Sequence, residues 1–475
     1  MSARKQVRRL AAITLAVSAG TAHAIDVLRV EQGISATPAG AMVGVCAFGT
    51  LPARPLQLRE VVERALCSNP KTRARWADVK AQAAAVGVAR AAYLPTLSAT
   101  WQGVRDKSRI DVDNHPLLGS DIASTVHSES VSLNWLLYDF GGREAGLRNA
   151  RSLLEAARAT QDATLQEVFA AAAKDYYAAQ TAVGALAAAA EVEDMTRRSM
   201  IAAQARVDKG IAPVTDALQA QTQHEQVLFG LTKAESELRN ALGTLASDMD
   251  LDPDALLEVP PVTTDAITSK TFGDSVEQMM AAVRASHPSV RAAQAQYDAS
   301  LAKVTQTRAQ GLPSVSLVGK YSRNNQPQSL GLGMPTYPAT GHDAYIGVQV
   351  SFPLFEGFGR YYQIHQAVAQ AERQEDVLDG TRRQVALDVW RSYQTLTGAT
   401  RNTENSANLL AIAERSWEGA RRRYNAGVGN ILELLATQTA LANAKQRRIQ
   451  ALADWNDARV DLASKLGALG HEDMQ

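Results

Sequence analysis

The side chains that most often carry enzyme chemistry occur in this 475-residue chain without the spacing that a catalytic centre needs. Its eight histidines are scattered, and none shares a His-x-x-x-His spacing with a carboxylate, as a metal site on one helix would require. The sequence has no Ser-His-Asp context, glycine-rich phosphate loop or paired-cysteine motif. Gly141-Gly142 is a lone pair, which does not predict a nucleotide site. We therefore expect no catalytic residue, no metal and no cofactor, and a protein that is not an enzyme.

Residues 1–24 have the three parts of a secretory signal. Four basic residues between positions 4 and 9 precede a short apolar stretch from Leu10 to Val17, and Ala22-His23-Ala24 supplies small residues for cleavage. The apolar stretch is far shorter than the ~20 residues that a membrane-spanning helix needs. No later segment is long and apolar enough either, so an exported chain that enters a membrane is expected to do so as strands.

Cys46 and Cys67 are the only cysteines. An oxidising periplasm would permit one disulfide between them. Two separate buried thiols are the alternative, because the sequence does not show whether the two side chains approach closely enough to be bridged.

The charge of the chain is balanced, with 49 Lys and Arg against 49 Asp and Glu, and gives no electrostatic case for binding nucleic acid. The apolar fraction is 46%, much of it alanine, and aromatic residues make up only 5%. This composition favours thin, closely packed helices over a thick globular core.

The chain contains the same pattern twice. Asn69-Pro70 recurs as His287-Pro288, Leu137 to Arg143 recurs as Leu354 to Arg360, and Val207 to Ile211 recurs as Tyr424 to Val428. A repeat of this length is too long for a solenoid and indicates two fused, similar halves around a pseudo-symmetry axis. We divide the chain into the signal 1–24, an irregular N-terminal extension 25–55, a first repeat 56–250, a linker 251–273, a second repeat 274–467 and a tail 468–475.

Each repeat contains two segments that alternate apolar with small or polar residues, as strands with one apolar face do. They cover about residues 95–105 and 126–138, and about 313–323 and 344–353. Loops over 104–125 and 323–343 join each pair. Their length and alternation are typical of outer-membrane barrel strands, although two ordinary hairpins on a soluble domain are the alternative. Aromatic residues in or beside the strands would form an interfacial girdle: Trp101, Trp135, Tyr138, Tyr321, Tyr345, Phe352 and Phe355.

Long helical stretches follow the strands. We expect helical hairpins over 142–246 and 360–466, which turn at Gly210 and Gly427. The stretch before Gly210 contains no proline and, at ~1.5 Å per residue, would be ~100 Å long, so it must lie along a bundle or a cylinder. Residues at heptad spacing would face a partner helix, with Gln161 as a polar interruption: Leu147, Ala150, Leu154, Ala157, Thr164, Val168 and Ala171.

Four strands cannot close into a barrel, because a membrane-spanning barrel must leave no edge and the smallest have about eight strands. Several chains must therefore each donate four strands, and this geometry alone allows two, three or four copies. The helices would continue the wall as a second cylinder. The expected product is a tube with a polar lumen through the outer membrane and the periplasm.

The chain resembles the TolC-type outer-membrane exit ducts over about residues 56–467. The motifs that carry the resemblance are Asn69-Pro70, Tyr93-Leu94-Pro95, Leu137-Tyr138-Asp139 with Gly141, Tyr424 to Gly427, and Asn443-Ala444-Lys445-Gln446. The resemblance implies a mixed α/β membrane protein that forms a homotrimer, in which four strands per chain make a shared 12-stranded β-barrel continued by a long α-helical barrel. The extension 25–55 and both cysteines depart from the family pattern.

The resemblance also implies a location and partners. The protein would lie in the outer membrane of a Gram-negative cell and extend into the periplasm. Its partners would be a periplasmic adaptor (membrane fusion) protein, an inner-membrane ABC exporter, a secreted protein substrate and outer-membrane lipids. Within the family, the wider sequence is similar to the outer-membrane components of type I secretion systems that export an adenylate cyclase–haemolysin toxin.

Two alternatives stay open. A multidrug efflux pump would use the same kind of duct, because partner specificity would lie in few residues at the hairpin tips. A periplasmic coiled-coil scaffold without a pore would keep the helices, but it would not need alternating strands that carry aromatic residues.

The resemblance assigns side chains to the periplasmic end of the duct. Asp216 takes the acidic gate position, and Tyr424 takes that of its tyrosine partner, whose hydroxyl would donate a charge-assisted hydrogen bond. Glu433 takes the position of a lumenal acidic ring that would attract cations. The alternatives are a solvated first-turn carboxylate for Asp216 and a surface ion pair for Glu433.

The turns show one departure from the family. Gly429 stands where the family has a gate arginine, and three arginines that lie one turn away, Arg421, Arg422 and Arg423, are candidate substitutes. Gly210 and Gly427 serve the tight turns, and the resemblance implies that these tips also receive the adaptor.

Overall fold

The computed structural model describes residues 26–40, 42–43, 46, 48, 54–115, 118–261, 275–326, 328–329, 336–337, 339–467 and 469. The expected signal and most of the expected tail lie outside these residues. The chain forms two compact units. The first contains the described parts of 1–34, 83–143 and 313–352, and the second contains those of 35–82, 144–312 and 353–475.

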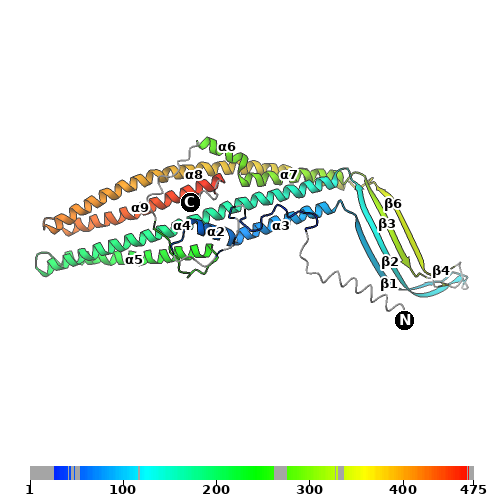
Figure 1. Cartoon of the computed structure of the whole chain (residues 1–475), viewed down its shortest axis with the longest axis horizontal. Helices are drawn as coiled ribbons and strands as arrows, with labels where there is room; N and C mark the ends of the chain where they lie inside the picture. The colour runs from blue at the N-terminus through cyan, green and yellow to red at the C-terminus, as the bar shows by residue number, and fades with distance from the viewer. Residues whose placement is uncertain are drawn as a thin grey trace. The chain divides into compact units, whose positions relative to one another are not determined.

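The first unit contains a four-stranded antiparallel sheet (Figure 1). Its strands are β1 (Thr96–Ile110), β2 (Ser120–Tyr138), β3 (Ser314–Asn324) and β6 (Gly341–Ser351), in the spatial order β1-β2-β3-β6. They occupy the four segments in which the alternation predicts strands. Two short strands, β4 (Gln328–Ser329) and β5 (Thr336–Tyr337), pair with each other in the second expected loop.

The first expected loop is shorter than the sequence predicts. Val104 pairs with Val126, and the ladder continues until Ile110 pairs with Ser120, so only residues 111–119 connect the strands. The segment from Arg105 to Arg109 is mostly charged and does not alternate with apolar residues, so its sequence does not predict a strand. The strand continues there because the hydrogen bonds of the ladder are made by the backbone and do not require apolar side chains.

The strand register assigns the side chains to two faces, since cross-strand partners share a face. One row of the apolar face contains Leu97, Leu133, Gly319 and Ile346, and the next contains Ala99, Val131, Tyr321 and Ala344. The opposite face carries Ser98, Ser132 and Lys320. The sheet is therefore apolar on one side and polar on the other.

The register places one member of the expected aromatic girdle, Tyr345, on the face opposite to the others in the strands. Tyr345 pairs with Lys320, which pairs with Ser132, so Tyr345 lies on the polar face. Its neighbours Ala344 and Ile346 lie on the apolar face, and the period of two places Tyr345 opposite to them. The aromatic strand residues on the apolar face are Trp101, Trp135, Tyr138 and Tyr321, while Phe352 and Phe355 follow β6 and are exposed.

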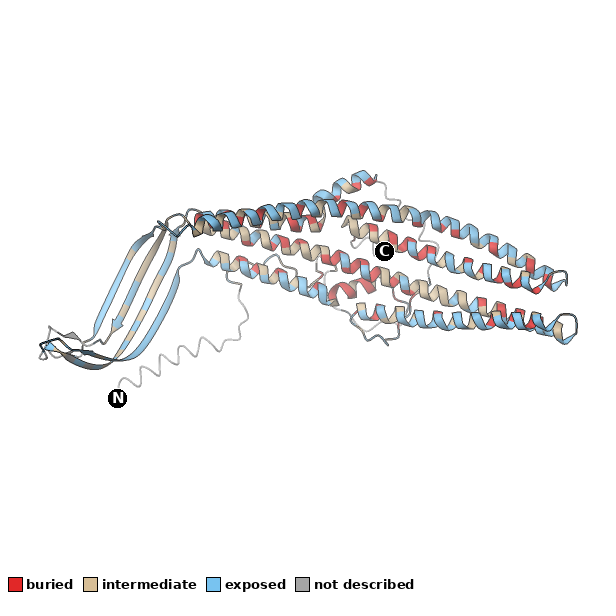
Figure 2. Ribbon diagram, turned by 180° about the vertical axis from the view of Figure 1, so that it is seen from behind, coloured by how far each residue is buried: buried red, intermediate tan, exposed pale blue. Residues whose placement is uncertain are grey.

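The described residues of one chain leave both faces of this sheet accessible. None of the described residues in its four strands is buried, and Figure 2 shows the strands in pale blue and tan. A contiguous exposed apolar face of this kind marks a surface that contacts lipid or another protein chain.

The second unit is helical. Two long hairpins are formed by α4 (Gly142–Asp208) with α5 (Val214–Asp248) and by α8 (Gly359–Asn425) with α9 (Ile431–Leu466). The shorter helices are α2 (Leu58–Ser68), α3 (Pro70–Ala91), α6 (Val276–Ser286) and α7 (Pro288–Ala309), and the residues of α3 from Ala83 onward belong to the first unit. Matching helices of the two halves have matching lengths, with 67 residues in both α4 and α8 and 22 in both α3 and α7.

None of the described helices combines the length and the apolar character that a membrane crossing requires.

The largest apolar core lies among α2, α4 and the end of α5. Its most buried members are Val61, Val62, Leu66, Leu165, Phe169, Ala173, Leu245 and Ala246. Of the heptad positions expected on α4, Leu154, Thr164 and Val168 are buried, but Ala171 is exposed. Since an α-helix turns every ~3.6 residues, a 3.5-residue stripe drifts around a long straight helix, and Ala172 takes the core position.

An acid–arginine pair holds each joint between a strand and a long helix. Asp139 accepts a hydrogen bond from the Arg143 backbone N–H at 2.6 Å and pairs with its guanidinium at 3.4 Å. Glu356 and Arg360 repeat this pairing at 3.0 Å. Gly141 has a φ of +87°, which a residue without a side chain adopts easily. The Gly141-Gly142 pair therefore serves a joint.

Cys46 and Cys67 are joined by a disulfide, with 5.7 Å between their Cα atoms. Cys67 lies in the last turn of α2 and is buried. The alternative of two separate thiols does not hold in this structure.

Candidate gate at the hairpin turns

The first hairpin turns at Gly210. Its φ is +71°, and its N–H donates to the Val207 carbonyl at 2.8 Å, while Ile211 N–H donates to the Arg206 carbonyl at 3.0 Å. These bonds close the end of α4. Pro213 then precedes the first turn of α5, where its fixed φ and missing N–H cost nothing.

The second hairpin turns at Gly427, which has a φ of +77°. The N–H groups of Val428 and Gly429 both donate to the Arg423 carbonyl at 3.0 Å. Asn430 caps α9, because its side-chain oxygen accepts the Glu433 N–H at 2.7 Å. Both glycines therefore occupy the left-handed turn positions that the sequence indicates.

Near the two turns the hairpins pack against each other. A small apolar cluster draws residues from all four long helices: Ala203 from α4, Ala220 from α5, Tyr424 from α8, and Ile431, Leu434 and Leu435 from α9. The tips of one chain therefore share a packed core.

Tyr424 lies at the centre of this cluster and is 3% exposed. Arg206 on α4 places its guanidinium 4.8 Å from the centre of the Tyr424 ring and donates to the Tyr424 backbone carbonyl at 3.0 Å. Burial raises the pKa of Tyr424; the nearby Arg206 lowers it and the charge of Asp216 raises it further. The Tyr424 hydroxyl is buried and has no hydrogen-bond partner among the described residues.

Asp216 stands in the first turn of α5, where its backbone N–H donates to the Pro213 carbonyl at 3.0 Å. Its side chain is close enough to Tyr424 for its charge to act on that hydroxyl, but the two are not hydrogen-bonded in this structure. In this single chain Asp216 stands in the first turn of α5 and Tyr424 in the last turn of α8, so both lie beside the hairpin turns.

Glu433 has a partner that its sequence position did not single out. Its carboxylate lies 3.7 Å from the Arg423 guanidinium, and both side chains are exposed. Of the other candidate arginines, Arg422 pairs with Glu418 at 2.8 Å and Arg421 lies over the Trp417 ring at 4.8 Å. Only Arg423 therefore faces one of the expected site residues.

Gly429 leaves no room for the arginine that the family places there. A Cβ atom at this position would lie 2.9 Å from the Tyr424 backbone nitrogen and 3.1 Å from the Arg423 carbonyl carbon. Because both neighbours are backbone atoms, a side chain would have to distort the turn.

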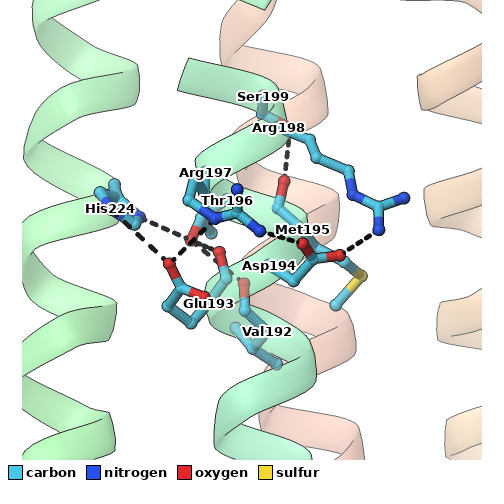
Figure 3. A network of polar contacts seen from close by, with 9 residues as sticks. All are labelled: Val192, Glu193, Asp194, Met195, Thr196, Arg197, Arg198, Ser199 and His224. Atoms are coloured by element: carbon cyan, nitrogen blue, oxygen red, sulfur yellow. Dashed lines mark hydrogen bonds and ion pairs between the residues drawn. The ribbon is translucent and has the colours of Figure 1, made fainter. Parts of the chain in front are cut away.

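Sequence reasoning missed a polar network farther along the hairpins (Figure 3). His224 of α5 lies 3.9 Å from the Glu193 carboxylate and 3.4 Å from the Thr196 hydroxyl, both on α4. Arg197 pairs with Glu193 at 3.4 Å and with Asp194 at 2.5 Å. The only sequence feature that indicated this network was the presence of acidic and basic residues three or four positions apart. Such pairs are common on solvent-exposed helices.

Polar contacts join α4 of the first hairpin to α9 of the second. Gln438 of α9 donates to the Ser199 hydroxyl of α4 at 2.6 Å. Lys445, within the Asn443-Ala444-Lys445-Gln446 motif, pairs with Glu191. In the part of the chain that the structure describes, no group of His, Cys, Asp and Glu side chains is arranged to hold a metal ion.

Comparison with known proteins identifies the family to which this chain belongs. The model of the family described as "Outer membrane efflux protein" matches residues 61–248 and again 280–468. The chain is 32% identical to protein CyaE of Bordetella pertussis over 99% of its own length and 98% of that protein. It is 23% identical to outer membrane protein TolC of Escherichia coli over 88% and 83%.

Solved structures agree on the fold. The outer membrane protein VceC of Vibrio cholerae matches with a TM-score of 0.73 at 18% identity, covering 86% of this chain and 96% of that one. The chain therefore belongs to the outer membrane efflux protein family, and it is an exit duct of the outer membrane that extends into the periplasm.

Proposed function

We propose that three copies of this chain form the outer-membrane duct of a type I secretion system, through which a protein toxin of the adenylate cyclase–haemolysin kind leaves the cell. The observation that carries the proposal is the end-to-end similarity to CyaE, at 32% identity over 99% of this chain. The TolC match is weaker, at 23% identity.

The open sheet supports assembly from several copies. Its edges are β1 and β6, and no strand formed by the described residues lies beside their outer backbone groups. With four alternating strands, β6 runs opposite to β1, so β1 of the next copy would continue the antiparallel pattern. Three copies would give twelve strands and no edge.

The two faces of the sheet support a water-filled interior. The apolar face would contact lipid, and the face with Ser132, Lys320 and Tyr345 would line the lumen. The repeated order of two short helices, two strands and two long helices supports two internal repeats. Three chains would then place six similar units around one axis.

The tips are proposed to receive the other components. Ile211 and Val428 stand exposed at the two turns, where a periplasmic adaptor linked to an inner-membrane ABC exporter would dock. Asp216 and Tyr424 would close the duct until docking, with Gly210 and Gly427 shaping the tips, and Glu433 would form an acidic ring around the axis.

Mass measurement in detergent tests the assembly. We expect a trimer that is extracted from membranes by detergent and not by high salt. A stable, membrane-inserted monomer would contradict the shared barrel, and release by salt alone would favour the coiled-coil scaffold.

Secretion assays test the cargo. In the native host, deletion of the gene should leave the toxin inside the cells and leave resistance to antibiotics and dyes unchanged. The family description makes a multidrug efflux pump the second candidate. That candidate predicts the reverse result, with normal toxin export and increased drug sensitivity.

A further inference from the structure

The N-terminal extension contains a segment that is fastened across the helices of the second unit. We call residues 35–40, 42, 43, 46 and 48 the strap. Trp76 on α3 donates its indole N–H to the Ser35 carbonyl at 3.0 Å, and Gln161 on α4 donates its amide to the Pro38 carbonyl at 2.8 Å. The strap thus crosses from one helix to another.

Beyond Pro38 the strap enters the largest apolar core. Ala39 is fully buried, and Met42, Val43 and Cys46 pack against the cluster that contains Leu66 and Phe169. The disulfide then joins Cys46 to Cys67 in the last turn of α2. Phe48 lies under the Arg64 guanidinium at 5.2 Å. One covalent bond and a few apolar side chains therefore hold this end of the strap.

The hydrogen bonds that the strap accepts from Trp76 and Gln161 have a common form. At both helices the strap contributes only a backbone carbonyl, and the side chain that recognises it belongs to the helix. A hydrogen bond of this kind contributes little net stability, because a carbonyl released from it is solvated by water. These two bonds contribute little, so the strap depends on the packing of Ala39, Met42 and Val43 and on the disulfide that keeps these side chains beside the core.

We propose that the Cys46–Cys67 disulfide is a redox-set clamp: when oxidised it keeps the strap closed over α3, α4 and the core, and when reduced it releases the strap while the rest of the duct stays assembled. The physical reason is effective concentration. With the bond intact, each opened strap contact re-forms from a tethered segment, whereas without it the same contacts must close a longer, unconstrained loop.

The clamp needs an oxidant, which we identify by class as a disulfide-carrying protein of the periplasm. One cysteine thiolate attacks the donor disulfide, and the second cysteine resolves the mixed disulfide. Two electrons and the two thiol protons of the chain pass to the donor, which leaves as a dithiol. The clamp therefore closes only after export, which separates its formation from synthesis in a reducing compartment.

Hydrogen–deuterium exchange on the full-length protein in detergent tests the clamp. Three samples are compared: the oxidised protein, the same protein after reduction, and the Cys46→Ser/Cys67→Ser variant. We expect amide exchange in residues 35–43 to become about tenfold faster in the last two samples, with exchange in α8 unchanged and the oligomer intact.

Two outcomes would overturn the proposal. Equal protection of residues 35–43 in all three samples would mean that the disulfide does not hold the strap. Faster exchange throughout the chain would mean that the bond stabilises the whole protein, as an ordinary disulfide does.

Variants of the two donor side chains sharpen the test. Trp76→Phe and Gln161→Met remove the donors, and in the oxidised protein each should speed strap exchange by no more than about threefold. In the reduced protein they should add nothing, because the strap is already released. Gln204→Met is the matched control, since Gln204 also lies on α4 but donates to Asp208 at 2.8 Å. If Trp76→Phe and Gln161→Met speed amide exchange in the strap equally in the oxidised and the reduced protein, the clamp is contradicted.

Discussion

Arg206 at the end of α4 and Tyr424 at the end of α8 join the two hairpins of one chain. The Arg206 guanidinium lies 4.8 Å from the centre of the Tyr424 ring and donates to its backbone carbonyl at 3.0 Å. The contact places a cation at the carboxyl end of a long helix, where the helix dipole favours positive charge. It also covers the residue that the family resemblance assigns to the gate.

Replacing Arg206 by Met should loosen the tips. The Tyr424 carbonyl would keep its bond from Gly427 N–H at 3.0 Å, so the loss is the cation–ring contact and one hydrogen bond, about 1–2 kcal/mol together. We expect higher conductance of the purified duct in a planar bilayer. Arg198→Met, which removes an exposed arginine paired with Asp194 on the same helix, is the control and should leave conductance unchanged.

The double change Asp216→Ala with Tyr424→Phe should make the duct leaky without destabilising it. The Tyr424 hydroxyl is buried and has no hydrogen-bond partner among the described residues of one chain, so its removal should not lower the thermal stability. If the assembled duct links this hydroxyl to Asp216, conductance should rise, and cells should become more sensitive to antibiotics. An assembled double variant with normal conductance would refute the gate assignment.

Changing Glu433 to Gln should lower the preference of the duct for cations with little change in conductance. The substitution removes a carboxylate and leaves its partner Arg423 unpaired, so both effects make the tip more positive. Arg423→Gln should shift the preference the opposite way. Reversal potentials in a salt gradient measure both, and Glu418→Gln is the control, because Glu418 pairs with Arg422. The same change of ion preference in all three variants would argue against an acidic ring.

Two aromatic residues should behave differently because they lie on opposite faces of the sheet. Trp101 shares the apolar face with Leu97, whereas Tyr345 shares the polar face with Lys320. Trp101→Ser should reduce insertion and the heat resistance of the assembled protein, since a large apolar side chain leaves the lipid-facing surface. Tyr345→Ser should leave both unchanged and alter conductance. Equal loss of insertion in the two variants would mean that the faces are misassigned.

The pair of Asp248 and Asp175 should make stability depend on pH. Burial raises the pKa of Asp248 from 3.8 to about 7, and Asp175 adds to the rise. Between these values the unfolded chain releases a proton that the folded chain keeps, so the free energy of unfolding falls as pH rises through this window. Asp248→Asn should therefore raise the apparent melting temperature at about pH 8 and leave it unchanged near pH 4.

The control for this prediction is the exposed Asp252, which lies four residues farther along the chain. Asp252→Asn should have no effect on melting at either pH. A gain of stability from Asp248→Asn that is the same at both pH values would contradict the proton linkage and would indicate better packing instead.

Local signals in the sequence were sufficient to predict the turns, the helix starts and the strand faces. Gly210 and Gly427 mark turns because only a residue without a side chain adopts a positive φ cheaply, and Pro213 marks a helix start for an equally local reason. The alternation in each strand records one apolar face, and its period of two needs no knowledge of partners. The unbroken helical stretch before Gly210 likewise predicted the 67 residues of α4.

Contacts between residues that are distant in the sequence could not be predicted in the same way. The face of Tyr345 follows from its pairing with Lys320, which depends on the register between two strands. Arg206 reaches Tyr424 across 218 residues, and Cys46 reaches Cys67 because the strap folds over α2. Such contacts are set by packing among helices, and helical periodicity states which face is apolar but not which helix covers it.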